Sequence, residues 1–66
     1  MQLTVNAEPR QLPDGATIAK LLEDLALPGT RVAVEVNRQL VRRVHHGEHV
    51  LHPGDVVEIV TLVGGG

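Results

Sequence analysis

The sequence contains no cysteine, phenylalanine, tyrosine or tryptophan. Without cysteine the chain can form no disulfide and offers no thiolate for a metal or for redox chemistry. Without aromatic side chains it lacks the stacking platforms on which proteins hold single-stranded nucleic acid. Its core must therefore be built from valine, leucine, isoleucine and alanine, and in a chain of 66 residues such a core is thin.

An excess of charge of one sign is also missing, because six Lys and Arg residues stand against eight Asp and Glu residues. The basic residues are scattered, which argues against a nucleic-acid interface. No apolar run approaches the roughly 20 residues of a membrane span, and the N-terminal residues lack the pattern of a signal peptide. We therefore expect one cytoplasmic domain with neither a membrane nor a nucleic acid as its partner.

The first residues predict a hairpin. Met1, Leu3 and Val5 alternate with polar residues, as in a strand with one buried face. A turn is expected over 7–10, which contains a proline, and a short return strand at 11–12.

A single helix is expected to begin after Thr17, whose hydroxyl can accept a hydrogen bond from a backbone N–H of the first turn. Four apolar residues follow at the spacing of one helix face: Ile18, Leu21, Leu22 and Leu25. Pro28-Gly29 is expected to end the helix, since proline lacks a donor and glycine permits a turn.

The second half of the chain predicts further strands, because valines alternate with other residues there. The expected segments are a strand at 30–36, a turn at 37–39, a short strand at 40–41, a polar irregular segment at 42–52, a turn at 53–55 and a long strand at 56–63. Within the irregular segment, Val50 and Leu51 are expected to form a small apolar anchor.

This order of elements indicates a two-layer α+β domain, because one helix with one apolar stripe needs one sheet face to cover it. If the last strand lies beside the first, the two are parallel and joined by a crossover connection. The result is the β-grasp architecture, a mixed sheet of four to five strands packed on one helix. From the pattern alone, other small α+β topologies stay open.

The last expected strand is apolar on both of its faces. Val57 and Ile59 can face the helix, whereas Val60 and Leu62 point away from it. Apolar residues on the outer face are either a common property of central strands or a docking surface, and the sequence favours neither. The candidate docking residues are Val60, Leu62 and Val63.

Four histidines fall within eight residues, in the pattern H-H-x-x-H-x-x-H: His45, His46, His49 and His52. Imidazoles at such spacing can gather zinc or nickel. Gly47 and Pro53, however, argue against a helix that would align them. We expect a solvated, histidine-rich loop and no metal site.

No set of nucleophile and base is recognisable in the sequence. The only hydroxyl side chains are four threonines, each with a role in a strand or a helix cap. The terminal glycines precede no helix, so they do not form a phosphate-binding loop. The chain is therefore not expected to be an enzyme.

The sequence ends in three glycines, Gly64, Gly65 and Gly66. Fully extended, they reach about 10 Å beyond the domain and can enter a passage that a side chain would block. The Gly66 carboxylate is ionised at neutral pH, so it reacts only after activation, for example as a mixed anhydride with AMP. We expect a β-grasp domain over 1–63 and a flexible functional tail over 64–66; a frayed end or a cloning remnant is the alternative.

Four stretches carry a resemblance to a known family: MQLTVN at 1–6, VAVEVN at 32–37, GDVVEI at 54–59 and VGGG at 63–66. Together with the size of the chain and its order of elements, they make it similar to the small ubiquitin-like sulfur carriers, above all those of thiamin biosynthesis. The resemblance covers nearly the whole chain.

The resemblance implies a β-grasp fold and a role as protein co-substrate. In that family the last glycine, here Gly66, is adenylated by an adenylyltransferase related to ubiquitin-activating enzymes, which uses ATP and magnesium. Sulfur drawn from a cysteine desulfurase then gives a C-terminal thiocarboxylate, which supplies sulfur to thiazole synthase. Gly65 corresponds to the family's penultimate glycine, and Gly64 extends the tail. The carrier itself would bind no cofactor.

Other functions stay open at this point. The small subunit of molybdopterin synthase and carriers for tRNA thiolation share the fold and the terminal glycines. A non-covalent β-grasp binding module belongs to a different class, because it would tolerate the loss of Gly66.

Overall fold

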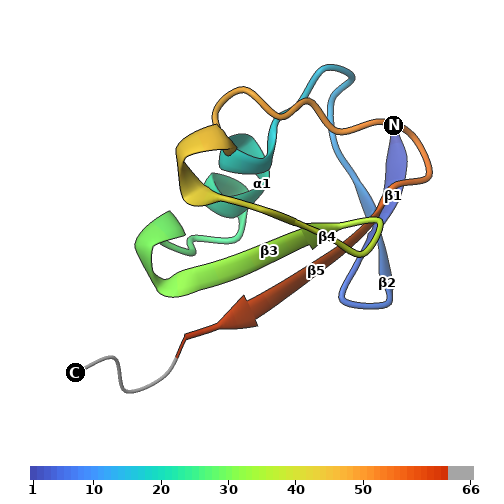
Figure 1. The fold of residues 1–66 in the computed structure, drawn as a ribbon. Coiled ribbons are helices and arrows are strands. Elements are labelled where there is room, and N and C mark those ends of the chain that lie inside the picture. Colours follow the sequence, from blue (N-terminus) through green and yellow to red (C-terminus); the bar gives the residue numbers. More distant parts are fainter. Residues whose placement is uncertain (63–66) are drawn as a thin grey trace.

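One helix packs across one face of a five-stranded sheet in the computed structural model (Figure 1). The structure describes residues 1–62, so the expected docking residue Val63 and the glycine tail at 64–66 lie outside the described residues. The elements are β1 (Gln2–Val5), β2 (Glu8–Gln11), α1 (Ile18–Asp24), the 3₁₀ helix η1 (Gly29–Arg31), β3 (Val32–Val36), β4 (Gln39–Val41), the 3₁₀ helix η2 (Arg43–His45) and β5 (Val56–Thr61).

The strand order is β2-β1-β5-β3-β4, which places the last strand in the centre of the sheet. β5 runs parallel to β1, with Val57 opposite Val5, and antiparallel to β3, with Ile59 opposite Val34. The expectation that the last strand lies beside the first is therefore confirmed, as is the β-grasp fold. The part of the chain that the structure describes contains no helix of the length and apolarity needed to cross a bilayer.

The hydrophobic core lies between α1 and one face of the sheet. Its members are aliphatic, as the composition requires: Leu3, Val5, Leu12, Ala16, Ile18, Leu21, Leu22, Val32, Val34, Val36, Leu51, Val57 and Ile59. The helix stripe and the alternating valines of β3 are thus buried as expected. Leu25, at the end of the stripe, is only partly buried against the core.

The first hairpin turns at Asn6-Ala7, earlier than the expected turn over 7–10. Both residues have positive φ, 50° and 69°, which is typical of a tight two-residue hairpin turn. Pro9 therefore lies inside β2, opposite Thr4, and not in a turn. Proline is tolerated there because β2 is an edge strand that needs no donor on its outer side.

Ala26 closes the end of α1 with a φ of 55°. Its N–H donates to the Glu23 carbonyl at 3.0 Å. The Leu27 N–H donates to the Leu22 carbonyl at 2.9 Å. This is a Schellman motif, in which glycine usually takes the left-handed position. The expectation that Pro28-Gly29 ends the helix is therefore wrong, because the backbone has already turned at Ala26.

The segment between β4 and β5 caps the N-terminus of α1. The N–H groups of Ile18 and Ala19 donate to the carbonyls of His49 (3.1 Å) and His46 (3.0 Å). Within the helix start itself, the Thr17 hydroxyl accepts from the Lys20 N–H at 3.2 Å, which confirms the expected N-cap. Helix donors that would otherwise lack partners are thus bound by the chain's own loop.

Several segments in the second half differ from expectation, among them β5, which ends at Thr61 and not at residue 63. β3 begins at Val32, two residues after the expected start, because Gly29–Arg31 form the 3₁₀ helix η1. Of the two residues expected to anchor the irregular segment, only Leu51 is buried. Val50 is exposed and forms an isolated bridge with Thr17. The turn begins at Asn37 as expected but ends one residue early, because Gln39 already belongs to β4. Asn37 and Arg38 have the same left-handed geometry as the first hairpin turn.

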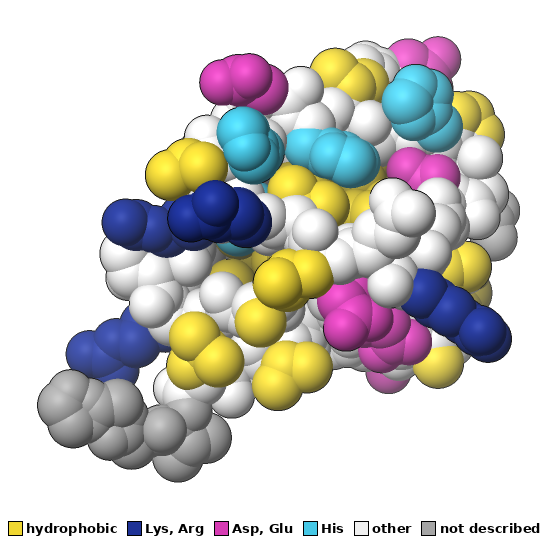
Figure 2. All heavy atoms as spheres, viewed as in Figure 1, with side chains coloured by type: hydrophobic (Ala, Val, Ile, Leu, Met, Phe, Trp, Pro, Cys, Tyr) yellow, Lys and Arg dark blue, Asp and Glu magenta, His cyan; other side chains and the backbone are white. Residues whose placement is uncertain are grey.

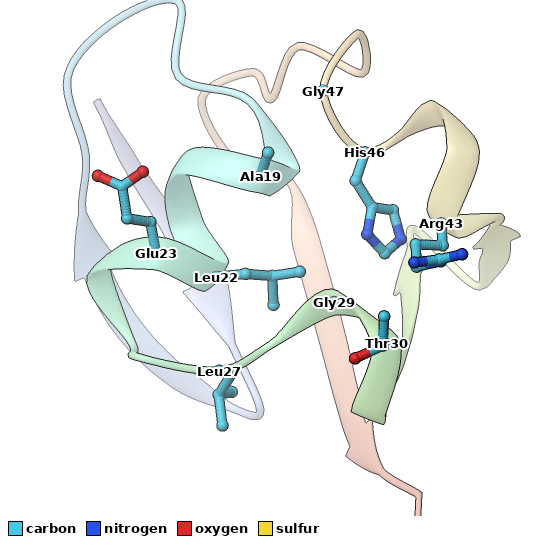
Figure 3. A pocket seen from close by; sticks show the side chains of 9 residues that line it. All are labelled: Ala19, Leu22, Glu23, Leu27, Gly29, Thr30, Arg43, His46 and Gly47. Atoms are coloured by element: carbon cyan, nitrogen blue, oxygen red, sulfur yellow. The ribbon is translucent and has the colours of Figure 1, made fainter.

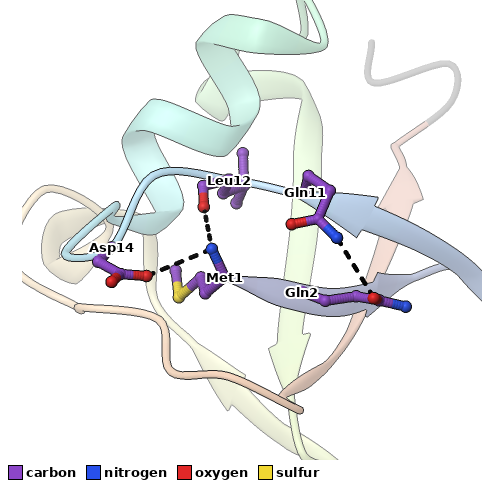
Figure 4. A network of polar contacts seen from close by, with 5 residues as sticks. All are labelled: Met1, Gln2, Gln11, Leu12 and Asp14. Atoms are coloured by element: carbon purple, nitrogen blue, oxygen red, sulfur yellow. Dashed lines mark hydrogen bonds and ion pairs between the residues drawn. The ribbon is translucent and has the colours of Figure 1, made fainter.

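Polar contacts join the first strand to the segment that follows β2 (Figure 4). The Met1 amino group donates to the Leu12 carbonyl at 2.6 Å and lies 3.2 Å from the Asp14 carboxylate. The Gln11 side-chain amide donates to the Gln2 side chain at 3.2 Å. These contacts hold β1 and β2 together at the end of the hairpin opposite its turn.

Replacing Ala26 with glycine is expected to raise the free energy of unfolding by about 0.5–1 kcal/mol, because glycine adopts this φ without the steric cost of a Cβ. In a thermal melt this corresponds to a rise in Tm of roughly 2–8 °C. The matched control is Ala19→Gly at an exposed position inside α1, where a loss of about 1 kcal/mol is expected. Equal effects at the two positions would contradict the proposed role of Ala26.

Candidate functional site

The two faces of β5 have opposite environments. Val57 is completely buried against the helix layer, whereas the side chains of Val60 and Leu62 are 60% and 51% exposed. The predicted division of the strand is therefore confirmed: inward residues build the core and outward residues are left to solvent. A two-layer fold has no second helix layer to cover that outer face.

Exposed hydrophobic residues from two strands lie on this uncovered face. We define the open-face patch as Leu40, Val56, Val60 and Leu62. Leu40 of β4, 65% exposed, joins it because it is opposite Glu35 of β3, whose side chain points away from the helix. Hydrophobic side chains lie beside acidic ones in the lower half of Figure 2. Exposed apolar groups gathered on one face are typical of a contact surface.

Two carboxylates lie within the same face, since Glu35 of β3 is directly opposite Glu58 of β5. Both side chains are exposed. Like charges directly opposite each other on neighbouring strands destabilise a sheet. The acidic pair was not singled out from the sequence, because it is the register of β3 and β5 that brings the two residues together.

Side-chain hydrogen bonds hold β5 in place where its neighbours end. The Asn6 side chain accepts from the Ile59 N–H at 2.7 Å and donates to the Ile59 carbonyl at 3.2 Å. Asn6 thus acts as one more residue of strand β1. On the other side, the Leu62 N–H donates to the Arg31 carbonyl at 2.7 Å. The strand is therefore fixed as far as the last residue that the structure describes.

A second asparagine holds the start of β5. The Asn37 side chain accepts from the Val56 N–H at 3.0 Å and donates to the Asp55 carboxylate at 3.0 Å. Asp55 in turn accepts from the His52 N–H at 2.9 Å. Both asparagines occupy left-handed turn positions, where Asn is one of the few suitable residues. An Asn at a hairpin turn is the sequence signal that could have pointed to this role.

A hollow of about 400 Å³ lies on the helix side of the sheet (Figure 3). It is lined by residues of α1, η1 and η2 and of the segments next to them, among them Leu22, Gly29, Arg43 and His46. Sequence reasoning did not predict this hollow, because it depends on how the loop after β4 folds over the helix.

His46 corrects the expectation of a solvated histidine loop. Only 5% of it is exposed, and its Nε2 lies 3.0 Å from the Val41 carbonyl. Its backbone carbonyl also caps the helix, so this histidine is a structural residue that holds the loop against α1. His45 and His52 are exposed. Across residues 1–62, no three His, Cys, Asp or Glu side chains are grouped closely enough to hold a metal ion.

Comparison with known proteins identifies the family. The model of the ThiS family matches residues 3–66, nearly the whole chain. The chain belongs to the ThiS family. The fold agrees: a crystal structure of the thiamine biosynthesis protein ThiS from Geobacter metallireducens superposes with a TM-score of 0.85 at 30% sequence identity, and the match covers 100% of both chains.

Two curated relatives of this ThiS-family chain differ in length. The sulfur carrier protein ThiS of Escherichia coli is 30% identical over 66 residues, which are 100% of both proteins. A thiazole synthase of Paramagnetospirillum magneticum is 35% identical over 66 residues, but the chain spans only 20% of that relative's length. A segment like this one therefore occurs both alone and within a larger polypeptide.

The opposite environments on β5 can be measured with one substitution at two positions. Val57→Thr is expected to lower the free energy of unfolding by about 1–3 kcal/mol, because it places a hydroxyl in the apolar core. Val60→Thr is expected to change it by less than about 0.5 kcal/mol, because that side chain is already in water. Urea unfolding of both variants provides the comparison. A large loss for Val60→Thr would mean that Val60 belongs to the core and not to a contact surface.

Proposed function

We propose that this chain is a sulfur carrier of thiamin biosynthesis, which carries sulfur as a thiocarboxylate on Gly66 and delivers it to thiazole synthase. The observation that carries this proposal is the end-to-end match to the sulfur carrier protein of Escherichia coli. The family match extends through Gly66, so the glycines are part of the shared sequence.

The proposed chemistry begins with activation of the Gly66 carboxylate, because an ionised carboxylate is a poor electrophile. One of its oxygens attacks the α-phosphorus of ATP, and pyrophosphate leaves. This step occurs in an adenylyltransferase related to ubiquitin-activating enzymes, where magnesium neutralises the phosphates. The product is an acyl adenylate at the end of the carrier.

Sulfur then replaces the adenylate. A persulfide sulfur derived from a cysteine desulfurase attacks the Gly66 carbonyl carbon, and AMP leaves. The resulting acyl disulfide is cleaved by a thiol, which supplies two electrons and becomes part of a new disulfide. The thiocarboxylate stays on the carrier, and the carrier itself contributes no catalytic side chain and no bound cofactor.

The folded body would serve to position the tail. Three glycines without side chains span about 10 Å when extended, so the reacting carboxylate can enter an enzyme while the domain stays outside. The fixed end of β5 sets where this reach begins, through the hydrogen bonds of Asn6 and of Leu62. Three of the four residues of the open-face patch lie on β5 or directly after it, so a protein that binds the patch is expected to receive the tail as well.

The names of the relatives favour thiazole synthase over the other acceptors. The relatives described above are a sulfur carrier named ThiS, a thiamine biosynthesis protein and a thiazole synthase that contains a similar segment. In the last of these, carrier-like and synthase sequences share one polypeptide. This supports thiazole synthase as the partner, ahead of molybdopterin synthase or a tRNA-thiolating enzyme.

Adding one alanine after Gly66 is expected to abolish ATP–pyrophosphate exchange and thiocarboxylate formation. The terminal carboxylate then lies one residue farther from the domain, and it belongs to a residue that has a Cβ. Exchange is measured with the activating enzyme, and the thiocarboxylate appears as the mass gained when sulfur replaces oxygen. An unchanged melting temperature controls for folding. If the extended chain were activated as well as the original one, the carrier function would be refuted and a non-covalent binding module favoured.

The double substitution Val60→Thr and Leu62→Thr is expected to weaken binding to the activating enzyme by about 5-fold to 30-fold, because about 1–2 kcal/mol of apolar burial is lost. Calorimetric titration measures the affinity. The matched control is Val44→Thr, which also replaces an exposed valine but lies in η2, outside the patch. Equal weakening by the control would mean that the patch has no special part in docking.

A further inference from the structure

The acidic pair of Glu35 and Glu58 lies on the uncovered face of the sheet. Residues directly opposite each other on neighbouring antiparallel strands have Cβ atoms about 4.5–5.5 Å apart, so the two carboxylates share one small area of the surface. Apolar neighbours border this area: Leu40 is opposite Glu35 on β4, and Val60 is the next outward residue after Glu58 on β5.

Neither carboxylate has an ion-pair partner among residues 1–62. Ion pairs in this part of the chain involve the Met1 amino group with Asp14, and Lys20 with Glu23 and Asp24. The two glutamates are therefore adjacent like charges, and neither makes an ion pair within residues 1–62. Such a pair is mildly unfavourable in the isolated chain and is stabilised by a cation that approaches it.

The surrounding patch determines what kind of cation this is. A protein that covers Leu40 and Val60 also removes water from the two carboxylates between them. Buried carboxylates without a partner are strongly disfavoured, so a neutral or acidic partner surface is excluded. A basic side chain that emerges from an apolar surface satisfies both requirements, and the planar fork of arginine is suited to two adjacent carboxylates.

We propose that Glu35 and Glu58 together bind one arginine or lysine side chain of the protein that covers the open-face patch. This inference rests on the proposed function, which supplies the activating enzyme as that protein. The apolar patch provides contact area, and the acidic pair determines how the two proteins are aligned. Because the partner has to place its cation opposite the pair, the direction of β5 relative to the partner is fixed. Arginine at this position also neutralises the repulsion within the carrier.

The test measures binding of the full chain to the activating enzyme from the same organism. Glu35→Gln and Glu58→Gln keep the size of each side chain and remove its charge. Each is expected to weaken binding by about fivefold to tenfold, and the double variant by about 30-fold or more, because the partner's cation is then buried without a counter-charge. Binding of the original chain is expected to weaken as NaCl rises, and that of the double variant to depend less on salt.

Two controls separate recognition from structure. Glu48→Gln removes the same charge at an exposed position in the loop after η2 and is expected to leave the affinity unchanged. Glu58→Gln is expected to keep or raise the melting temperature, because it relieves the repulsion with Glu35. A variant that lost affinity only in proportion to a loss of folded protein would show a structural role and overturn the proposal.

The outcomes also separate this proposal from the proposed function. If the double variant bound as tightly as the original chain, with the same salt dependence, the acidic pair would have no part in recognition, although the carrier function would stand. If the original chain neither bound the activating enzyme nor acquired a thiocarboxylate, the proposed function would fail, and the assignment of a cationic partner would fail with it.

Discussion

The structure depends on the burial of β5 on one face only. β5 pairs with β1 on one side and β3 on the other, so it is the central strand, and its inward residues Val57 and Ile59 complete the core under α1. A chain without aromatic residues has enough apolar volume for a single layer of helix. The opposite face of the same strand is therefore left in water, and that is where the open-face patch lies.

Two asparagines add side-chain hydrogen bonds to β5 where the strand pairing of its neighbours is incomplete. β1 pairs with only the first part of β5, and the Asn6 side chain continues its pattern to Ile59. At the start of β5, the Asn37 side chain likewise accepts a hydrogen bond from the Val56 N–H. In both cases the left-handed turn conformation directs an amide toward the strand. The side chains of these turns therefore supplement the strand pairing that holds β5.

Patterns of local spacing were sufficient to predict the α-helix and the strands, because burial on one face imposes a period on each of them, but they did not predict the 3₁₀ helices η1 and η2. The stripe from Ile18 to Leu22 and the alternating valines of β3 are examples. Boundaries were less predictable, since they depend on backbone conformations that the residue type does not dictate. Ala26 in the left-handed region, where glycine is usual, shifted the end of the helix, and Pro9 was accepted within a strand because that strand is at an edge.

The candidate site was predictable only in part, for a related reason. The outward position of Val60 and Leu62 follows from alternation along one strand, and it is confirmed. The pairing of Glu35 with Glu58, the addition of Leu40 and the burial of His46 depend on contacts between segments far apart in the sequence. The sequence resemblance pointed to Gly66, whose position in space lies outside the described residues.

The order in which the strands are synthesised has a consequence for biogenesis. β5 follows every other strand along the chain, yet it occupies the middle of the sheet, so the two outer hairpins have nothing to join them until it emerges from the ribosome. A nascent chain that stops before β5 has neither a closed core nor the larger part of the patch. An incomplete molecule would therefore lack the surface that only the completed sheet presents.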